Sequence, residues 1–225
     1  MMPRTPLYEY RAWPSGGMPH VAAVHHIFGL GVAEIRTDTY VVLPKHSQCL
    51  MIVRGGTQFE LKVKTGVQAP VSTWKTPMRS PFPLRRSVVR MLQEVFPTSE
   101  LPHRISAPVD LISWLGRDAS IFTVSKRMVH FQSAGCTAEL TQVDTHGYRA
   151  ETFCLTAKRY DTVVETLGMI PGPRLPNLDY GSWLQRRILG TSPTPVPQIA
   201  PILQDARKAE LESSWRAALL TLRSA

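Results

Sequence analysis

Residues 58–64 read Gln-Phe-Glu-Leu-Lys-Val-Lys and alternate between polar and apolar side chains without a break. Successive side chains of a β-strand point to opposite faces, so the polar residues would share one face and Phe59, Leu61 and Val63 the other. A half-buried strand with its charges in water has the same pattern, because antiparallel sheets commonly have one solvated face. The stretch therefore predicts a strand, and it leaves open whether the charges face solvent or an enclosed interior.

Charged residues recur at alternate positions in other strand-like segments. The segments at 7–13, 34–43 and 49–54 carry them, and Gly55-Gly56 joins the last of these to 57–64 in a predicted hairpin. For one strand alone, charges in water are the simpler interpretation. Several charged faces in one chain instead favour a closed sheet with those faces turned inward. Such an interior would receive a polyanion.

The composition is consistent with an anionic partner. The chain has 225 residues, with 26 Lys and Arg against 17 Asp and Glu and a net charge of +9. Nucleic acid, a phosphorylated small molecule and inorganic polyphosphate would all complement this charge. No apolar run approaches the roughly 18 residues of a membrane span, and residues 1–14 lack the apolar core of a signal peptide. The three cysteines form no metal or disulfide signature. We therefore expect a cytoplasmic protein with no membrane partner.

The remaining periodicities predict an α+β protein with about eight antiparallel strands, enough to close a barrel. Further strands are expected at 67–75, where Pro70 interrupts the pattern, and at 121–131, 137–143 and 148–156, with a proline-rich connector at 77–83. Helices are expected at 20–30, 84–96, 109–115, 160–167, 180–189 and 203–222. The composition shifts at Pro171, which divides the chain into a barrel over 1–170 and a C-terminal helical extension with a Pro-rich linker over 171–225.

The order of these elements resembles the CYTH, or triphosphate tunnel metalloenzyme, superfamily, of which the chain would be a divergent member. The resemblance covers residues 5–170. The residues that carry it are Leu7-Tyr8-Glu9-Tyr10-Arg11, Asp38-Thr39-Tyr40, Leu50-Met51-Ile52-Val53-Arg54, Phe59-Glu60-Leu61-Lys62-Val63-Lys64, Val124-Ser125-Lys126-Arg127, Ala138-Glu139-Leu140, Glu151-Thr152-Phe153 and the helix with Asp161 and Val163.

The resemblance implies an eight-stranded antiparallel tunnel that holds a triphosphate between inward Lys and Arg side chains, with glutamates that bind Mg²⁺ or Mn²⁺. The family's first strand carries Glu-x-Glu-x-Lys. Here Glu9 and Arg11 match the second Glu and the Lys, but Leu7 stands in place of the first Glu. On the last strand, where the family carries one or two glutamates, Phe153 and Leu155 follow Glu151 on the same face. These departures put catalysis in question more than the fold.

Phosphoryl transfer needs converging cations and a metal that bridges two phosphates, so the candidate roles follow from charge. The resemblance implies Glu60 and Lys62 as catalytic residues. The candidate phosphate-binding residues are Arg11, Arg36, Arg54, Lys62, Lys64 and Arg127. The candidate metal ligands are Glu9, Glu60, Glu139 and Glu151, with Asp38 beside them. These carboxylates could equally pair with the cations of the tunnel. Lys126 and Arg127 are adjacent and must face opposite sides, and the polar neighbours Thr123 and Ser125 favour Arg127 as the inward residue.

Three functions remain open. One is hydrolysis of inorganic triphosphate or of a nucleoside or thiamine triphosphate, with Mg²⁺ or Mn²⁺. Another is binding of such a phosphorylated anion without cleavage, which the missing glutamates favour. The third is nucleic-acid binding, which ranks last because no aromatic residues are interleaved with the basic ones. The helix at 203–222 would be a lid for one tunnel mouth or a homodimer contact, because its apolar stripe with Trp215 must be covered.

Overall fold

The computed structural model describes residues 6–15, 21–43, 46–96, 102, 104–115 and 119–190. The strands are β1 (Leu7–Ala12), β2 (Val32–Val42), β3 (Cys49–Arg54), β4 (Gln58–Gln68), β5 (Val71–Pro81), β6 (Ser120–Ser133), β7 (Cys136–Thr145) and β8 (Tyr148–Ala157). The helices are α1 (Val21–Phe28), α2 (Arg86–Val95), α3 (Pro108–Leu115), α4 (Tyr160–Met169) and α5 (Tyr180–Ile188). The helix expected at 203–222 lies outside the described residues.

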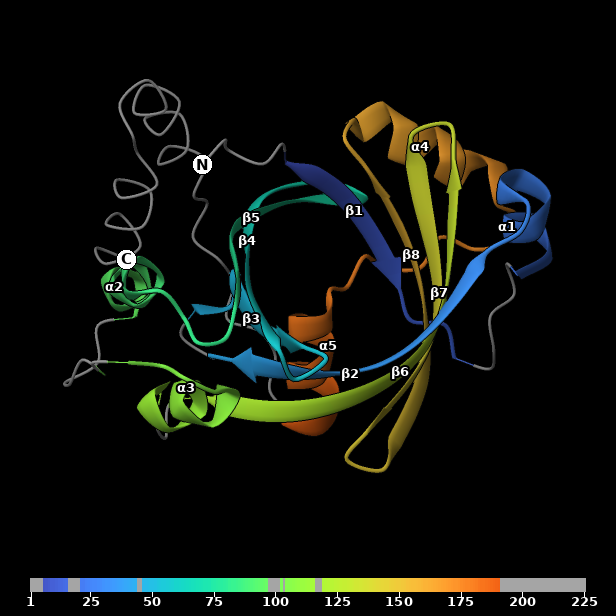
Figure 1. The fold of residues 1–225 in the computed structure, drawn as a ribbon. Coiled ribbons are helices and arrows are strands. Elements are labelled where there is room, and N and C mark those ends of the chain that lie inside the picture. Colours follow the sequence, from blue (N-terminus) through green and yellow to red (C-terminus); the bar gives the residue numbers. More distant parts are fainter. Residues whose placement is uncertain are drawn as a thin grey trace, which may run out of the picture.

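The strands form a closed barrel in the order β1-β5-β4-β3-β2-β6-β7-β8 (Figure 1). Every neighbouring pair is antiparallel. The expected eight-stranded antiparallel tunnel is therefore confirmed. Short turns at Gly55-Gly56, Gly135 and Gly147 join consecutive strands, and these glycines have positive φ angles that a residue without Cβ adopts without strain.

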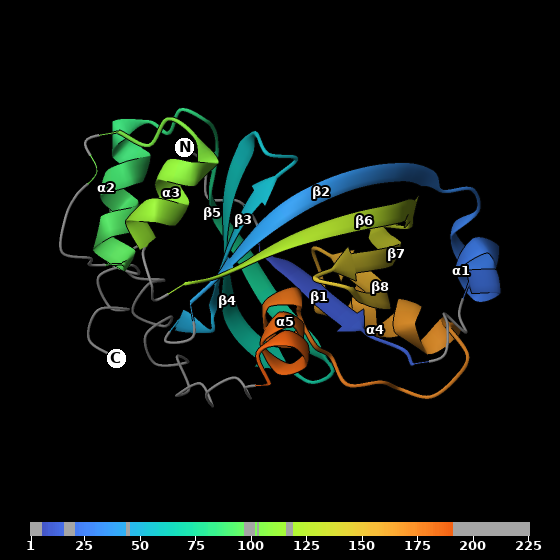
Figure 2. The ribbon, with the colours of Figure 1, turned by 90° about the horizontal axis from the view of Figure 1, so that it is seen from below.

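The apolar core lies largely outside the barrel, between the strands and the helices. Phe59 and Leu61 of β4 are fully buried in a cluster with residues of α2 and α3. A second cluster lies under α1 and α4, against β7 and β8. Figures 1 and 2 show α2 and α3 on one side of the barrel and α1 and α4 on the other. The apolar face of the alternating stretch therefore packs outward against helices, which leaves its charged face for the interior.

Helix α5 covers one end of the interior (Figure 2). Its residues Tyr180, Trp183 and Leu184 join a third apolar cluster with inward residues of the barrel, among them Tyr40 and Trp74. Part of the tunnel is thus filled by apolar side chains rather than by charges. Among the described helices, none has a stretch long and apolar enough to cross a membrane.

The fifth strand is present, but its expected bounds and the connector expected after it were wrong. Strand β4 continues to Gln68, Pro70 lies in the turn, and β5 runs through the supposed connector to Pro81. Proline has no backbone N–H, so it is tolerated where a ladder hydrogen bond is not needed. Pro70 meets that condition in the turn, and Pro77 meets it beside the irregularity in register between Leu61 and Val63 of β4.

Candidate anion-binding tunnel

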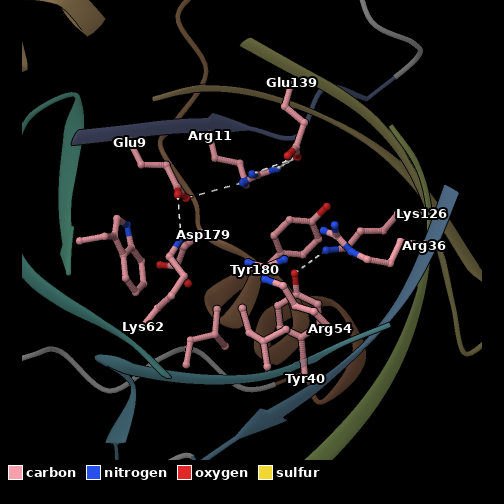
Figure 3. A pocket seen from close by; sticks show the side chains of 13 residues that line it. Glu9, Arg11, Arg36, Tyr40, Arg54, Lys62, Lys126, Glu139, Asp179 and Tyr180 are labelled. Carbon is pink, nitrogen blue, oxygen red and sulfur yellow. Dashed lines mark hydrogen bonds and ion pairs between the residues drawn. The ribbon is translucent and has the colours of Figure 1, made fainter. Parts of the chain in front are cut away.

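Charged side chains from six strands point into the barrel interior, and Figure 3 shows seven of them, Glu9, Arg11, Arg36, Arg54, Lys62, Lys126 and Glu139, around a common cavity. The full set is Glu9 and Arg11 on β1, Arg36 and Asp38 on β2, Arg54 on β3, Glu60 and Lys62 on β4, Lys126 on β6 and Glu139 on β7, with Lys64 of β4 further along. Alternation alone places them there, because inward positions of a barrel strand are two residues apart. The burial of so many charges requires that each be paired.

Arg11 is the centre of one ion-pair group. Its guanidinium donates to Glu139 Oε1 at 3.2 Å and to Thr152 Oγ1 at 3.3 Å. Glu9 lies 3.7 Å from Arg11 and accepts from Lys62 at 3.0 Å. Burial alone would raise the pKa of both carboxyls, but nearby cations lower it, to about 2 for Glu139. Both groups are therefore ionised at neutral pH.

Asp38 is the centre of a second group. Its Oδ2 accepts from Lys126 Nζ at 2.7 Å and from Arg54 at 3.3 Å, and its Oδ1 accepts from Arg36 at 2.8 Å. Lys126 also donates to the Tyr40 hydroxyl at 2.6 Å. Burial raises the pKa of Asp38, but the charge and hydrogen bond of Lys126 outweigh that effect and the pKa is lowered. A fully buried carboxylate thus holds cations from three strands in fixed positions.

Glu60 is held by two arginines. Arg54 donates to both of its oxygens, at 2.7 and 3.1 Å, and Arg79 of β5 donates to Oε2 at 3.1 and 2.6 Å. Burial would raise the pKa of Glu60, yet the hydrogen bonds and charges of these arginines lower it to about 2. Sequence analysis missed Arg79, because it follows Pro77 in the supposed connector.

The expectation that Arg127 faces the tunnel was wrong. Lys126 is 3% exposed and lies inside, while Arg127 is exposed on the outer face. Polar neighbours did not identify the inner face of β6, since the tunnel near α5 is lined by apolar residues such as Val124. The outer face of β6 is polar here: it carries Ser125, whose hydroxyl lies 3.4 Å from that of Thr37 on β2.

Glu151, expected among the metal ligands, does not face the tunnel either. Its carboxylate accepts from Gln142 at 3.3 Å in an exposed position on the outer face. The inward residues of β8 are Thr152 and Cys154, whereas Phe153 packs outward in the cluster under α4. Glu151, Phe153 and Leu155 therefore share the outer face of β8, and the tunnel face of this strand carries no carboxylate at 152 or 154.

The described residues contain no group of three or more His, Cys, Asp or Glu side chains arranged to hold a metal ion. Glu9, Glu60 and Glu139 do face the interior, but each is bound by its own cation: Glu9 by Lys62, Glu60 by two arginines and Glu139 by Arg11. Mg²⁺ and Mn²⁺ prefer free oxygen ligands. This donor set, as arranged, does not fit a resident divalent metal, and Mg²⁺ or Mn²⁺ dependence stays a prediction.

Three residues that line the cavity each carry a buried donor atom with no hydrogen-bond partner within the described part of the chain: Arg11 Nε, Trp74 Nε1 and the Tyr180 hydroxyl. Arg11 Nε has only the 3.7 Å ion-pair contact with Glu9. Buried polar groups are nearly always hydrogen-bonded, and an exception indicates strain, water or a ligand. All three can donate, so the cavity is suited to a molecule rich in acceptor oxygens. Its volume is about 50 Å³, and a single water needs roughly 10–15 Å³ on this measure.

Helix α5 supplies two cavity residues that sequence analysis did not assign to the site. The Asp179 carboxylate contacts Lys64, and the Tyr180 ring stacks on Tyr40 with centroids 5.1 Å apart. From the sequence, Asp179 can be recognised only as a candidate N-cap residue before a helix. Its contact with Lys64 joins distant parts of the chain and leaves no local pattern in the sequence. His130 of β6 also contacts a tunnel carboxylate: its Nδ1 lies 3.8 Å from Glu139 Oε2, and its Nε2 lies 3.1 Å from a Glu34 oxygen.

No protein-family model and no curated protein matches the sequence. Solved structures with a similar chain arrangement include a protein from Pyrococcus horikoshii, with 14% identity, TM-score 0.42 and coverage of 72% of this chain and 84% of that one. A Bacillus halodurans protein provisionally described as an adenylate cyclase has 9% identity, TM-score 0.39 and coverage of 86% and 95%. A Hippeastrum protein provisionally described as an adenylyl cyclase, with a dominant triphosphatase activity, has 8% identity, TM-score 0.41 and coverage of 88% and 96%.

Proposed function

We propose that the tunnel binds the phosphate groups of a small phosphorylated anion, such as tripolyphosphate or a nucleoside or thiamine triphosphate. The observation that carries this proposal is a cavity lined by four cationic side chains and by three residues whose buried donor atoms make no hydrogen bond to the described residues. The cations are Arg36, Arg54, Lys62 and Lys126, and the donors are Arg11 Nε, Trp74 Nε1 and the Tyr180 hydroxyl. Phosphate oxygens are strong acceptors, and arginine binds them through paired N–H groups.

Binding would exchange resident carboxylates for ligand oxygens. Lys62 and Arg54 are each only about one-fifth exposed and already paired, with Glu9 and Glu60 respectively. A phosphate group near Lys62 would therefore share that cation with Glu9 or displace it. Repulsion from the remaining carboxylates then limits affinity, so we expect moderate rather than very tight binding.

Hydrolysis with Mg²⁺ or Mn²⁺ is the alternative outcome of the same test. Because the carboxylates of the tunnel are bound to cations, we derive no chemical step through a metal. Binding of tripolyphosphate, ATP and thiamine triphosphate is measured by calorimetry in EDTA and again in Mn²⁺, together with phosphate release. Binding in EDTA without release supports the proposal. Release that requires Mn²⁺ would make the protein a hydrolase, and no binding under either condition would reject the proposal.

Lys62→Gln, with Lys158→Gln as a matched control, tests whether binding occurs in the tunnel. Lys158 is exposed on the outer surface just beyond β8, so its substitution removes the same charge without altering the interior. A charge-assisted hydrogen bond contributes about 1.5–3 kcal/mol, which corresponds to roughly a 10- to 150-fold change in Kd. We expect the Kd to rise by this factor for Lys62→Gln and to change little for Lys158→Gln. Equal losses would indicate non-specific attraction to a basic protein.

A further inference from the structure

Asp179 is the N-cap residue of α5 and lies in the wall of the tunnel cavity (Figure 3). Its Oδ1 accepts from the Ser182 backbone N–H at 3.0 Å, and its Oδ2 accepts from the Ser182 hydroxyl at 3.0 Å and contacts Lys64 Nζ. The residue is 6% exposed. One carboxylate thus both caps the helix and neutralises a cation of the tunnel.

Lys64 belongs with Lys62 to the charged face of β4. Their Nζ atoms lie 5.1 and 4.8 Å from the centre of the Trp74 ring, so both ammonium groups are held over one aromatic surface. Lys62 is paired with a strand carboxylate, Glu9. Lys64 is paired with Asp179, which comes from outside the barrel. The two neighbouring lysines of β4 therefore differ: Lys62 pairs with a carboxylate of a barrel strand, and Lys64 pairs with the N-cap carboxylate of α5.

The segment before α5 is attached to β1, which keeps the Asp179 carboxylate at the tunnel. Leu178 N donates to Arg11 O at 2.8 Å, and Arg11 N donates to the Asn177 side chain at 2.9 Å. The Trp13 indole donates to Leu178 O at 2.7 Å. A tethered group competes for its site at a high effective concentration. Asp179 is consequently a strong competitor for Lys64 against any free anion.

The cavity is too small for a triphosphate beside the groups that now line it. Its volume of about 50 Å³ is room for a few waters by the measure of roughly 10–15 Å³ each. Among its described lining residues, Asp179 and Tyr180 alone are not carried by a barrel strand. Closed strands are held on both sides by ladder hydrogen bonds, so a longer anion gains room most readily at the start of α5.

We propose that Asp179 is a resident anion of the tunnel, which occupies Lys64 in the free protein and is displaced from it by a phosphate group of the ligand. This inference rests on the proposed function. Displacement exposes the carboxylate to water and leaves Lys64 to the ligand, so Asp179 weakens the binding of polyanions and couples their binding to the position of α5.

Asp179→Asn tests the inference with little structural change. Asparagine is as good an N-cap as aspartate, so the Oδ1 contact to Ser182 is kept while the charge opposite Lys64 is lost. We expect the Kd for tripolyphosphate, measured by calorimetry, to fall by about tenfold or more, by the magnitude of one charge-assisted contact. Asp161→Asn is the matched control, because Asp161 is an exposed aspartate in the first turn of α4 that pairs with Arg159. The same gain in both variants would overturn the inference.

A double variant shows whether Asp179 acts through Lys64. In a Lys64→Gln background, Asp179→Asn should no longer tighten binding, and an undiminished gain would contradict the proposed exchange. The wild-type protein gives an independent measurement through the ¹³C signal of the Asp179 carboxylate, which should shift when tripolyphosphate saturates the protein. An unchanged signal at saturation overturns the inference even if the variants fail to fold. Absence of any binding by the wild type would instead reject the proposed function.

Discussion

Substitution of Glu60 by glutamine should destabilise the protein strongly, because it replaces a buried carboxylate between two guanidinium groups with a neutral side chain. Glu60 is 2% exposed and accepts four hydrogen bonds from Arg54 and Arg79. Removal of one partner from a buried ion pair typically costs about 3–5 kcal/mol. Arg54 keeps its contact with Asp38 at 3.3 Å, and Arg79 is more than one-third exposed, so we expect the lower end, about 3 kcal/mol.

The pKa of Glu60 gives a consistent magnitude and a pH dependence. A decrease from the ordinary 4.5 to about 2 corresponds to about 3 kcal/mol at 1.36 kcal/mol per pH unit. Because the folded-state pKa is lower than the unfolded-state pKa, this stabilisation is fully present above pH 4.5. It is lost as the pH falls toward 2, where a protonated Glu60 resembles glutamine.

Urea denaturation of both proteins between pH 7 and pH 2 measures this effect. The difference in unfolding free energy should be about 3 kcal/mol at pH 7 and should shrink below pH 4.5. In a chain of this length that corresponds to a decrease in Tm of roughly 6–12 °C. A difference below 1 kcal/mol at pH 7, or one that does not vary with pH, would refute the assigned ion pairs. If Glu60 were instead catalytic, Glu60→Gln would abolish Mn²⁺-dependent phosphate release, and the same variant tests that role.

Three further predictions concern other parts of the molecule. Lys126→Met should lower the unfolding free energy by about 3 kcal/mol, since it leaves Asp38 short of a buried partner, while Arg127→Met should change it by less than about 0.5 kcal/mol; similar values in urea denaturation would contradict their opposite orientation. Trp13→Phe should increase tryptic cleavage in α5, because the Trp13 ring stacks on Trp183 at 4.1 Å and its indole binds Leu178 O; unchanged cleavage would show that α5 is held by other contacts. A thiol reagent at pH 8 should label no cysteine of the folded protein, since burial raises the pKa of the thiols, to about 12 for Cys49, and labelling before denaturation would contradict that burial. The three thiols are Cys49, Cys136 and Cys154.

Most strands could be predicted because each is a local pattern. Alternation at 58–64, the turn glycines and the spacing of charged faces predict the barrel, and β3 at Cys49–Arg54 was expected at its observed bounds. Prediction failed at β5, where Pro77 reads as a break in sequence. A register irregularity opposite that residue accommodates it, and pairing between strands cannot be read from one strand alone.

The site was less predictable, because partners come from separate strands. The inward direction of Arg11, Arg54 and Lys62 follows from alternation, but that of Lys126 does not, since apolar residues also face the tunnel. Glu9, Glu60 and Glu139 were candidate metal ligands from their residue type alone. Only the fold shows that Glu60 lies between Arg54 and Arg79.

The sequence by itself determined that this protein has charged faces on alternating strands, because alternation depends only on the two-residue period of a β-strand. It also determined that these faces turn inward if the sheet closes. Only the tertiary structure decided what each charge meets, because barrel closure sets the register that brings Glu9 to Lys62 and Asp38 to Lys126. The lysines of the alternating stretch therefore lie in a tunnel, as expected, but Lys64 is matched by Asp179, a residue 115 positions away that no local pattern connects to it.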